Sequence, residues 1–302
     1  MPRVKVTLQE IRERTYKPID AWWTVLLVDP LASRLVLLVA PYRWITPNVL
    51  TLIATIIGVG SMVSFAQGDQ QWLIVGAVLF HLSFVVDCMD GKIARLNGTG
   101  TVFGQWLDFV LDRVRVFFCA ITLFGGQYAQ HHDVKYLWLM SVAIFLDLIR
   151  YLNGSQVSKV RRGMTDKLNS LKYPVELSPE PAQDMSEPGD EAAEETTDTN
   201  VAATIAAARP KSLKSRVGAY LKRNRIRTHL FSGIEYEMFV YILAPLTGLI
   251  FSITVFAGAA MLAFEFFLIY KLYRTTTAYP AKLAAAQEKY DAYQQGQVPT
   301  AL

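Results

Sequence analysis

Four aspartates at helical spacing are the residues of this sequence best suited to chemistry. Asp87 and Asp90 are three positions apart, and Asp108 and Asp112 are four apart. Each pair therefore lies on one face of a helix. Both pairs stand in apolar segments, where a carboxylate is costly in free energy unless it is paired or binds a metal. We therefore predict that the four carboxylates converge on one site.

Carboxylates that converge between two adjacent helices favour a hard divalent cation. Oxygen ligands suit Mg²⁺ or Mn²⁺, and the lack of Cys or His ligands disfavours zinc. Two ions about 3.5–4 Å apart can clamp a phosphate and stabilise attack by an oxygen nucleophile. Gly91, Ala94 and Gly104 share the faces of the acids and leave room for a bulky, flat group beside the backbone. The pattern thus predicts one or two divalent ions and chemistry at a phosphate.

The same residues resemble a family signature. The pattern Asp87-x2-Asp90-Gly91-x2-Ala94-Arg95-x8-Gly104-x3-Asp108-x3-Asp112 is similar, at all eight fixed positions, to that of the CDP-alcohol phosphotransferases. These are integral membrane enzymes that make phospholipid headgroups. The segment Thr46-Pro47-Asn48 with Thr51 also resembles the family. The resemblance covers residues 20–155 well, and it covers the last two predicted helices only by topology.

The resemblance implies a transfer reaction. A phosphoalcohol group, expected to be phosphatidyl, would pass from a CDP-alcohol such as CDP-diacylglycerol to an acceptor hydroxyl, with release of CMP, in phospholipid or related phosphodiester biosynthesis. The metal ligands, for two expected Mg²⁺ or Mn²⁺ ions, would be Asp87, Asp90, Asp108 and Asp112. Asp112 would ligate the second ion or act as general base. The CDP-binding residues would be Asn48, Thr51, Gly91, Ala94, Arg95 and Gly104.

The sequence leaves the acceptor open. Family members that use glycerol phosphate or inositol phosphate usually end the fourth helix with a Tyr-x-x-Ala-Arg-Ala-Glu-like stretch, whereas this chain reads Leu148-Ile149-Arg150-Tyr151-Leu152-Asn153-Gly154. A polyol phosphate, an amino alcohol or another small alcohol would each be compatible. If the acceptor carries a phosphate, the candidates to bind it through their guanidinium groups are Arg150, Arg223 and Arg225.

The sequence supports two other classes of function less well. A divalent-cation transporter would also place carboxylates among helices, but here all four acids fall in two adjacent segments. An inactive scaffold does not need an intact signature. The basic residues are confined to segments between apolar blocks, so we expect membrane lipids and no nucleic acid as partners. A homodimer is left open.

The elements that position the aspartates are predicted to be membrane helices. The 302 residues are 52% hydrophobic and only 19% charged, and the apolar residues form long blocks. We predict an all-α membrane protein with six spanning helices and the metal site between the second and third, near the cytoplasmic face. The six segments are 47–67, 71–95, 102–125, 134–155, 232–252 and 256–275. A helix over 21–40 precedes them; Pro30 and Arg34 favour an amphipathic helix at the interface over a spanning one.

Charge in the loops predicts the orientation. Lys and Arg precede the first spanning helix and follow the second, the fourth and the sixth, whereas 66–70 and 126–133 contain neither. The positive-inside rule therefore predicts cytoplasmic N and C termini in a multi-pass protein, expected in a bacterial cell membrane.

Five regions follow from this pattern: 1–46 with the interfacial helix, 47–155 with the signature, a cytoplasmic insert over 156–231, two further helices over 232–275, and a cytoplasmic tail over 276–302. Within the insert, 173–199 holds nine acidic residues and no basic one, which predicts disorder. Residues 209–228 hold eight basic residues and no acidic one. They could lie on anionic headgroups or form a solvated tether. Ser232 and Glu235 predict a capping box, and we expect a turn between the last two helices at Thr254 to Gly258.

Overall fold

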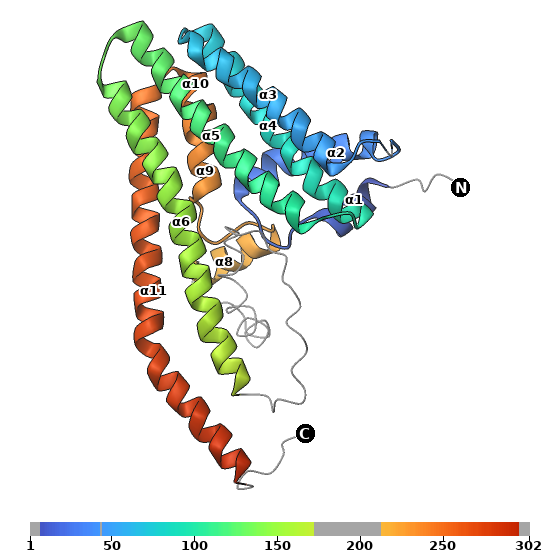
Figure 1. The fold of residues 1–302 in the computed structure, drawn as a ribbon, viewed down its shortest axis with the longest axis vertical. Helices are drawn as coiled ribbons and strands as arrows, with labels where there is room; N and C mark the ends of the chain where they lie inside the picture. The colour runs from blue at the N-terminus through green and yellow to red at the C-terminus, as the bar shows by residue number, and fades with distance from the viewer. Residues whose placement is uncertain (1–6, 43, 172–212, 296–302) are drawn as a thin grey trace. The chain divides into compact units, whose positions relative to one another are not determined.

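The computed structural model describes residues 7–42, 44–171 and 213–295, and this part of the chain is helical without a β-strand (Figure 1). The helices are α1 (Leu8–Thr15), α2 (Asp29–Val39), α3 (Pro47–Gln67), α4 (Gln70–Asn97), α5 (Val102–His131), α6 (Lys135–Ser170), α8 (Leu213–Arg223), α9 (Gly233–Met238), α10 (Ala244–Thr247) and α11 (Ile250–Gln294). A π-helical turn, Thr24–Val28, leads into α2, and another, Phe239–Leu243, joins α9 to α10.

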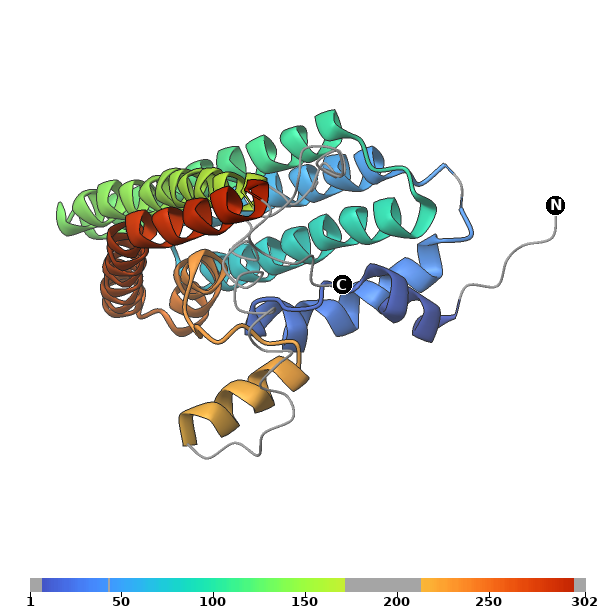
Figure 2. The same cartoon turned by 90° about the horizontal axis from the view of Figure 1, so that it is seen from below.

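The chain folds as two compact units, and α6 and α11 contribute to both. The described residues up to 148 and from 213 to 262 belong to the first unit, and residues 149–171 and 263–295 belong to the second. In the first unit α3 packs against both α4 and α5, and the three helices run side by side (Figures 1 and 2). The four signature aspartates lie on α4 and α5 and therefore in one unit.

Side-chain caps fix where α3, α4 and α5 begin, at Thr46, Asp69 and Thr101. Oγ1 of Thr46 accepts a hydrogen bond from the backbone N–H of Val49 at 3.4 Å, and the Thr101 hydroxyl accepts one from Gly104 at 3.0 Å. Asp69 caps α4 in the same way, through the N–H of Trp72 at 3.1 Å. These caps satisfy amide groups that the first turn of a helix leaves unpaired. The predicted bounds of α3 are confirmed, and α4 and α5 extend past theirs.

Four helices in the described part of the chain are long and apolar enough to cross a membrane. They are Pro47–Gln67, Gln70–Asn97, Lys135–Ser170 and Ile250–Ala292. The predicted third span is the continuous helix α5, but charged residues near Asp108 and Asp112 lower its hydropathy. The predicted fifth span is built from α9, a π-helical turn and α10. A multi-pass helical protein is thus supported, and the count of six crossings stays a prediction.

The turn before the last helix lies earlier than predicted. Gly248 adopts a left-handed conformation with φ 71° and ends α10, whereas Thr254 to Gly258 lie inside α11. A left-handed glycine costs little because it has no Cβ. Gly258 instead allows close packing, since a Cβ there would lie 3.2 Å from Cδ1 of Leu146. The predicted turn at Thr254 to Gly258 was therefore wrong.

The capping box that opens α9 is confirmed. The Ser232 hydroxyl and the Ser232 backbone N–H donate hydrogen bonds to Oε2 of Glu235, at 2.7 and 3.0 Å. Both residues are buried. The side chain of Glu235 therefore satisfies polar groups that the helix end would otherwise bury without a partner.

A buried ion pair joins the N-terminal elements to the signature helix. Nζ of Lys92 on α4 lies 2.7 Å from Oδ1 of Asp29, with 5% and 3% of the two side chains exposed. The second oxygen of Asp29 accepts a hydrogen bond from Arg225 at 3.1 Å. The Asp20 N–H donates to the carbonyl of Arg225 at 2.9 Å, so residues 225–227 lie beside Asp20. Asp29 thus joins α2, α4 and the segment that precedes α9.

We expect Asp29→Ala to destabilise the protein strongly, because it leaves the Lys92 ammonium buried beside no carboxylate. The loss should be about 3–5 kcal/mol, as for other broken buried pairs. Thermal unfolding of the detergent-solubilised protein measures it. The control is Lys135→Gln, which breaks the exposed Asp133 pair and should change the unfolding midpoint little, because solvent screens this pair. Equal shifts of the unfolding midpoint in the two variants would contradict this role for Asp29.

Candidate metal centre

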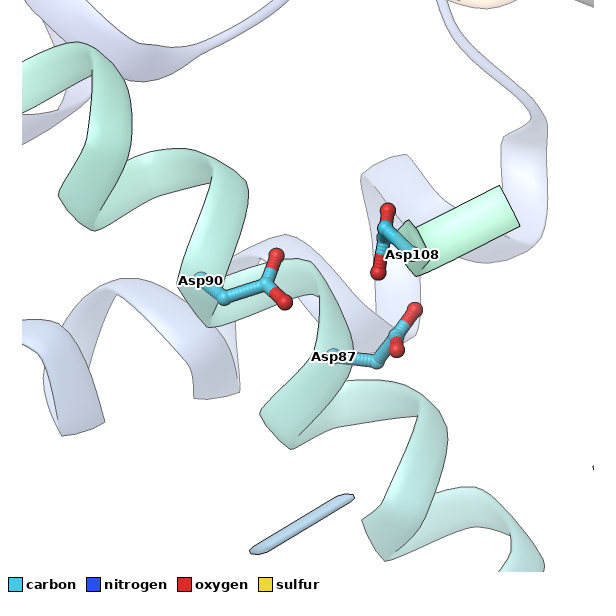
Figure 3. Close-up of side chains that lie close together, drawn as sticks. All are labelled: Asp87, Asp90 and Asp108. Atoms are coloured by element: carbon cyan, nitrogen blue, oxygen red, sulfur yellow. The ribbon is translucent and has the colours of Figure 1, made fainter. Parts of the chain in front are cut away.

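Three of the four signature aspartates converge across the space between α4 and α5 (Figure 3). One oxygen atom each from Asp87, Asp90 and Asp108 lies within 4.8 Å of the other two. Asp87 and Asp90 are buried on α4, and Asp108 on α5 is half-buried. Figure 3 shows the three carboxylates pointing toward one another from the two helices. Three of the four predicted side chains therefore meet, and the group within 4.8 Å does not include Asp112.

Helix α3 supports this cluster from a third side. The hydroxyl of Thr51 forms a short hydrogen bond to Oδ2 of Asp90, and it also lies 3.1 Å from the carbonyl oxygen of Pro47, one turn earlier. A hydroxyl can donate only one hydrogen bond at a time, so these acceptors share its proton. Thr51 thus ties the carboxylate of Asp90 to the first turn of α3 and restricts its rotation.

Arg115 supplies a positive charge beside the cluster. Its Nη2 contacts Oδ1 of Asp112 at short range, and its Nη1 lies 3.5 Å from Oδ1 of Asp87. Nη1 also donates a hydrogen bond of 3.1 Å to the hydroxyl of Ser83. The side chain of Arg115 is only 7% exposed, so solvent screens these contacts little. Arg115 therefore holds Asp112 and offsets part of the repulsion among the acids.

A glycine on α3 makes room for Arg115. A Cβ built at Gly58 would lie 2.9 Å from Cδ of Arg115 and 3.4 Å from Oγ of Ser83. Contacts below 3.0 Å force atoms to move, so any larger residue at this position would require the Arg115 side chain to shift. Gly58 and Ser83 are site residues that the sequence analysis missed. A single small residue in an apolar helix carries no signal of a contact with another helix.

Arg113 is the counter-charge of a second acidic pair in the same unit. Its Nη1 lies 2.9 Å from Oδ1 of Asp147 on α6 and 3.0 Å from Oε1 of Glu237 on α9. Both carboxylates are buried. Arg113 thus contacts acids of α6 and α9, whereas Arg115 contacts the signature aspartates Asp87 and Asp112.

The residues present fit a divalent cation. Every ligand atom in the cluster is a carboxylate oxygen, which suits Mg²⁺ or Mn²⁺. Two oxygens on opposite sides of one Mg²⁺ lie about 4.2 Å apart, so a separation of 4.8 Å needs only small side-chain movements. Four signature carboxylates and the Arg115 guanidinium carry three formal negative charges between them. This excess favours binding of one or two divalent ions.

The structure groups the predicted CDP-binding residues in neighbouring pairs. Asn48 lies beside Gly104, since Oδ1 of Asn48 is 3.9 Å from the position of a Cβ there. Gly91 lies beside Arg95, because a Cβ built at Gly91 would be 3.6 Å from Nη1 of the Arg95 guanidinium. Thr51 contacts Asp90 as described above, and Ala94 follows Gly91 by one helical turn. The role of these residues in binding CDP stays a prediction.

The candidate acceptor-binding arginines differ in their contacts. In the second unit Nη1 of Arg150 lies 3.1 Å from Oε1 of Glu265, and both side chains are buried. In the first unit Arg225 contacts Asp29 and donates two hydrogen bonds to the Lys17 carbonyl, at 2.9 and 2.7 Å. Arg223 at the end of α8 is exposed. Two of the three thus have carboxylate partners within the protein.

Comparison with known proteins identifies the same region. Residues 44–173 match the family model for CDP-alcohol phosphatidyltransferase. A phosphatidylinositol phosphate synthase of Corynebacterium glutamicum is 36% identical over 99 residues, which are 32% of this chain and 42% of that protein. An archaetidylinositol phosphate synthase of Methanothermobacter thermautotrophicus is 32% identical over 87 residues, 29% of this chain and 39% of the relative.

A third relative has a different name and matches to a similar extent. It is a CDP-diacylglycerol--glycerol-3-phosphate 3-phosphatidyltransferase of Cereibacter sphaeroides, 32% identical over 84 residues, which are 28% of this chain and 38% of the relative. The chain therefore spans about two fifths of the length of these relatives. The family match lends no support to the cation-transporter alternative.

The matched region contains all eight positions of the aspartate signature and the carboxylate cluster that they build. Residues 44–173 of this chain are therefore similar to the CDP-alcohol phosphatidyltransferase family.

Proposed function

We propose that this protein transfers a phosphatidyl or related phosphoalcohol group from a CDP-alcohol, such as CDP-diacylglycerol, to an acceptor hydroxyl. The observation that carries the proposal is the meeting of Asp87, Asp90 and Asp108 within 4.8 Å, in a region that matches the family. In the reaction an oxygen–phosphorus bond forms between the acceptor and the β-phosphate. The bond from that phosphate to CMP breaks, and CMP leaves.

In this proposal the four aspartates have two different roles. Asp87, Asp90 and Asp108 would hold a divalent ion, and Asp112 would ligate a second ion or take the proton of the acceptor hydroxyl. Mg²⁺ or Mn²⁺, when bound, would neutralise phosphate charge and stabilise the attacking oxygen. Arg115 keeps Asp112 in place, and Thr51 does the same for Asp90. Arg95 is a candidate to pair with the diphosphate.

The names of the relatives support a phosphorylated polyol as the acceptor. Two are named for the synthesis of inositol phosphate lipids, and the third is named for glycerol 3-phosphate. We infer the same class of acceptor here. A panel of phosphorylated and unphosphorylated alcohols, with CMP release as the readout, tests this inference directly.

The membrane arrangement is part of the proposal. We infer six membrane crossings. Four of them are the helices that are long and apolar enough to span a bilayer, and α5 and the α9–α10 region are the other two. The charge of the loops supports cytoplasmic termini and a site near the cytoplasmic face. Labelling of single cysteines from either side of sealed vesicles tests the topology.

We expect Asp112→Asn and Asp87→Asn to differ in effect. Asp112→Asn should lower transfer by about 100-fold or more while retaining donor and metal binding, because three carboxylates still hold the first ion. Asp87→Asn should weaken metal binding and transfer together. Titration of Mg²⁺ and CDP-donor binding beside the rate of CMP release measures both effects. Asp133→Asn in an exposed loop is the control. Full turnover by Asp112→Asn would remove that residue from the mechanism.

We expect Arg115→Met to make stability depend on Mg²⁺. The variant keeps an apolar chain beside Gly58 but removes the charge that offsets Asp87 and Asp112, which should cost about 3–5 kcal/mol without metal. Added Mg²⁺ should raise its unfolding midpoint more than that of the wild type, since the ion replaces the lost charge.

Arg113→Met is the matched control for this experiment. It removes a charge from Asp147 and Glu237 rather than from the signature aspartates, so it should lower the midpoint without increasing the response to Mg²⁺. An equal Mg²⁺ response in Arg115→Met and the wild type would exclude Arg115 from the metal centre.

We also expect that substitution of the candidate acceptor arginines weakens binding of the acceptor and not of the CDP-donor. Arg150→Ala, or Arg223→Ala with Arg225→Ala, should raise the KM of a phosphorylated acceptor at least about tenfold and leave that of the CDP-donor nearly unchanged. The loss of one charge-assisted contact, roughly 1.5–3 kcal/mol, gives this factor. Initial rates with each substrate varied in turn measure the two constants.

Glu265→Ala is the control that separates binding from packing. It removes the buried partner of Arg150 but keeps the guanidinium. If Arg150 binds the acceptor, only Arg150→Ala should raise the acceptor KM. Equal kinetic effects of both variants would assign the Arg150 pair to stability.

A further inference from the structure

Helix α8 (Leu213–Arg223) has the residue pattern of a helix that lies on a membrane surface. Val217, Tyr220 and Leu221 follow one another at i, i+3 and i+4 and so share one face. Arg216 and Arg223 lie to one side of this face, and Lys222 lies to the other. An apolar face flanked by basic residues fits the boundary between acyl chains and anionic headgroups.

Among the described residues, α8 does not bury this face against the protein. None of its described side chains, those of residues 216–223, is buried, and Val217 and Tyr220 are 50% and 67% exposed. Figure 2 shows α8 standing apart from α1, α2 and α4. A helix of 11 residues is marginally stable in water without packing. A surface beyond the described residues of this unit would therefore stabilise it.

The residues that follow α8 tie its C-terminal end to the start of the predicted interfacial helix. The backbone of Arg225 accepts a hydrogen bond from Asp20, and the Arg227 N–H donates to the Asp20 carbonyl at 3.0 Å. The indole N–H of Trp22 donates to the carbonyl of Leu230 at 2.9 Å. Trp side chains favour the headgroup region of a bilayer. The end of α8 is thus tied to residues suited to the membrane surface.

We propose that α8 lies on the cytoplasmic surface of the bilayer that contains α3 and α4, with Val217 and Tyr220 among the acyl chains and its basic residues on anionic headgroups. Each basic residue near such a surface adds a favourable electrostatic contribution. This role goes beyond the proposed transfer reaction and does not depend on it.

Two other occupants are less compatible with α8. The acidic residues within 173–199 of the same chain could neutralise its charge, but they offer few apolar side chains to cover Val217 and Tyr220. These residues lie outside the described part of the structure. A nucleic acid would pair with the basic residues and leave the apolar face in water. A lipid surface alone satisfies both faces.

Hydrogen–deuterium exchange of the full chain in lipid nanodiscs tests the proposal. The backbone amides of residues 213–223 should exchange about tenfold more slowly in discs of phosphatidylglycerol and phosphatidylcholine than in discs of phosphatidylcholine alone. Raising the salt concentration to about 1 M should remove most of this difference, because the Debye length falls to about 3 Å.

Variants separate the contributions of charge and apolar area. Arg216→Gln with Lys222→Gln should abolish the dependence on anionic lipid, and Val217→Ser with Tyr220→Ser should speed exchange in both kinds of disc. Lys282→Gln with Lys289→Gln, which removes two exposed charges from α11, is the matched control and should change neither rate at α8.

Deletion of Glu176 to Thr199 distinguishes the occupants. Protection of α8 should survive this deletion if lipid is the partner. Protection that is lost with the acidic segment, or that is equal in anionic and neutral discs, would overturn the proposal. Because exchange is measured without substrate, failure of the transfer activity would not affect the outcome.

Discussion

Repulsion among carboxylates in a poorly solvated space is the constraint on which the rest of this structure depends. Asp87, Asp90 and Asp108 bring oxygens within 4.8 Å of one another where little water can screen them. Such an arrangement persists only if positive charge is close. Arg115 supplies one part, and the deficit that remains is the reason that the site should bind divalent cations. In the proposed reaction, the same deficit would concentrate cations where a diphosphate must be neutralised.

Helix α3 helps to position both the carboxylate cluster and Arg115. Thr51 holds Asp90, and Gly58 leaves space for Arg115, so both ends of the charge balance depend on one helix. On the other side of α4, Lys92 enters a buried pair with Asp29. Because α4 is fixed on both faces, the carboxylates cannot relax their repulsion by moving the helix away.

The sequence predicted those features that follow from local spacing. The shared face of Asp87 and Asp90, the bounds of α3 and the Ser232 capping box depend on residues within one or two turns. The partners of buried charges could not be predicted, because Asp29 and Lys92 are 63 residues apart and no periodicity links them. Gly248 was missed for a related reason: both it and Gly258 are glycines in one apolar run, and only packing against Leu146 shows which of them stays helical.

The contacts of the candidate arginines also indicate which of them could bind an acceptor phosphate at the lowest cost in free energy. An arginine that already pairs with a buried carboxylate can bind a phosphate only by sharing or exchanging its partner, and the acid left behind loses its compensation. Glu265 imposes this cost on Arg150, and Asp29 imposes it on Arg225. Arg223 is exposed and bears no such cost. In the proposed reaction, acceptor specificity could therefore change through exposed residues outside the signature, while the charge balance at Asp87 and Arg115 would keep the chemistry constant.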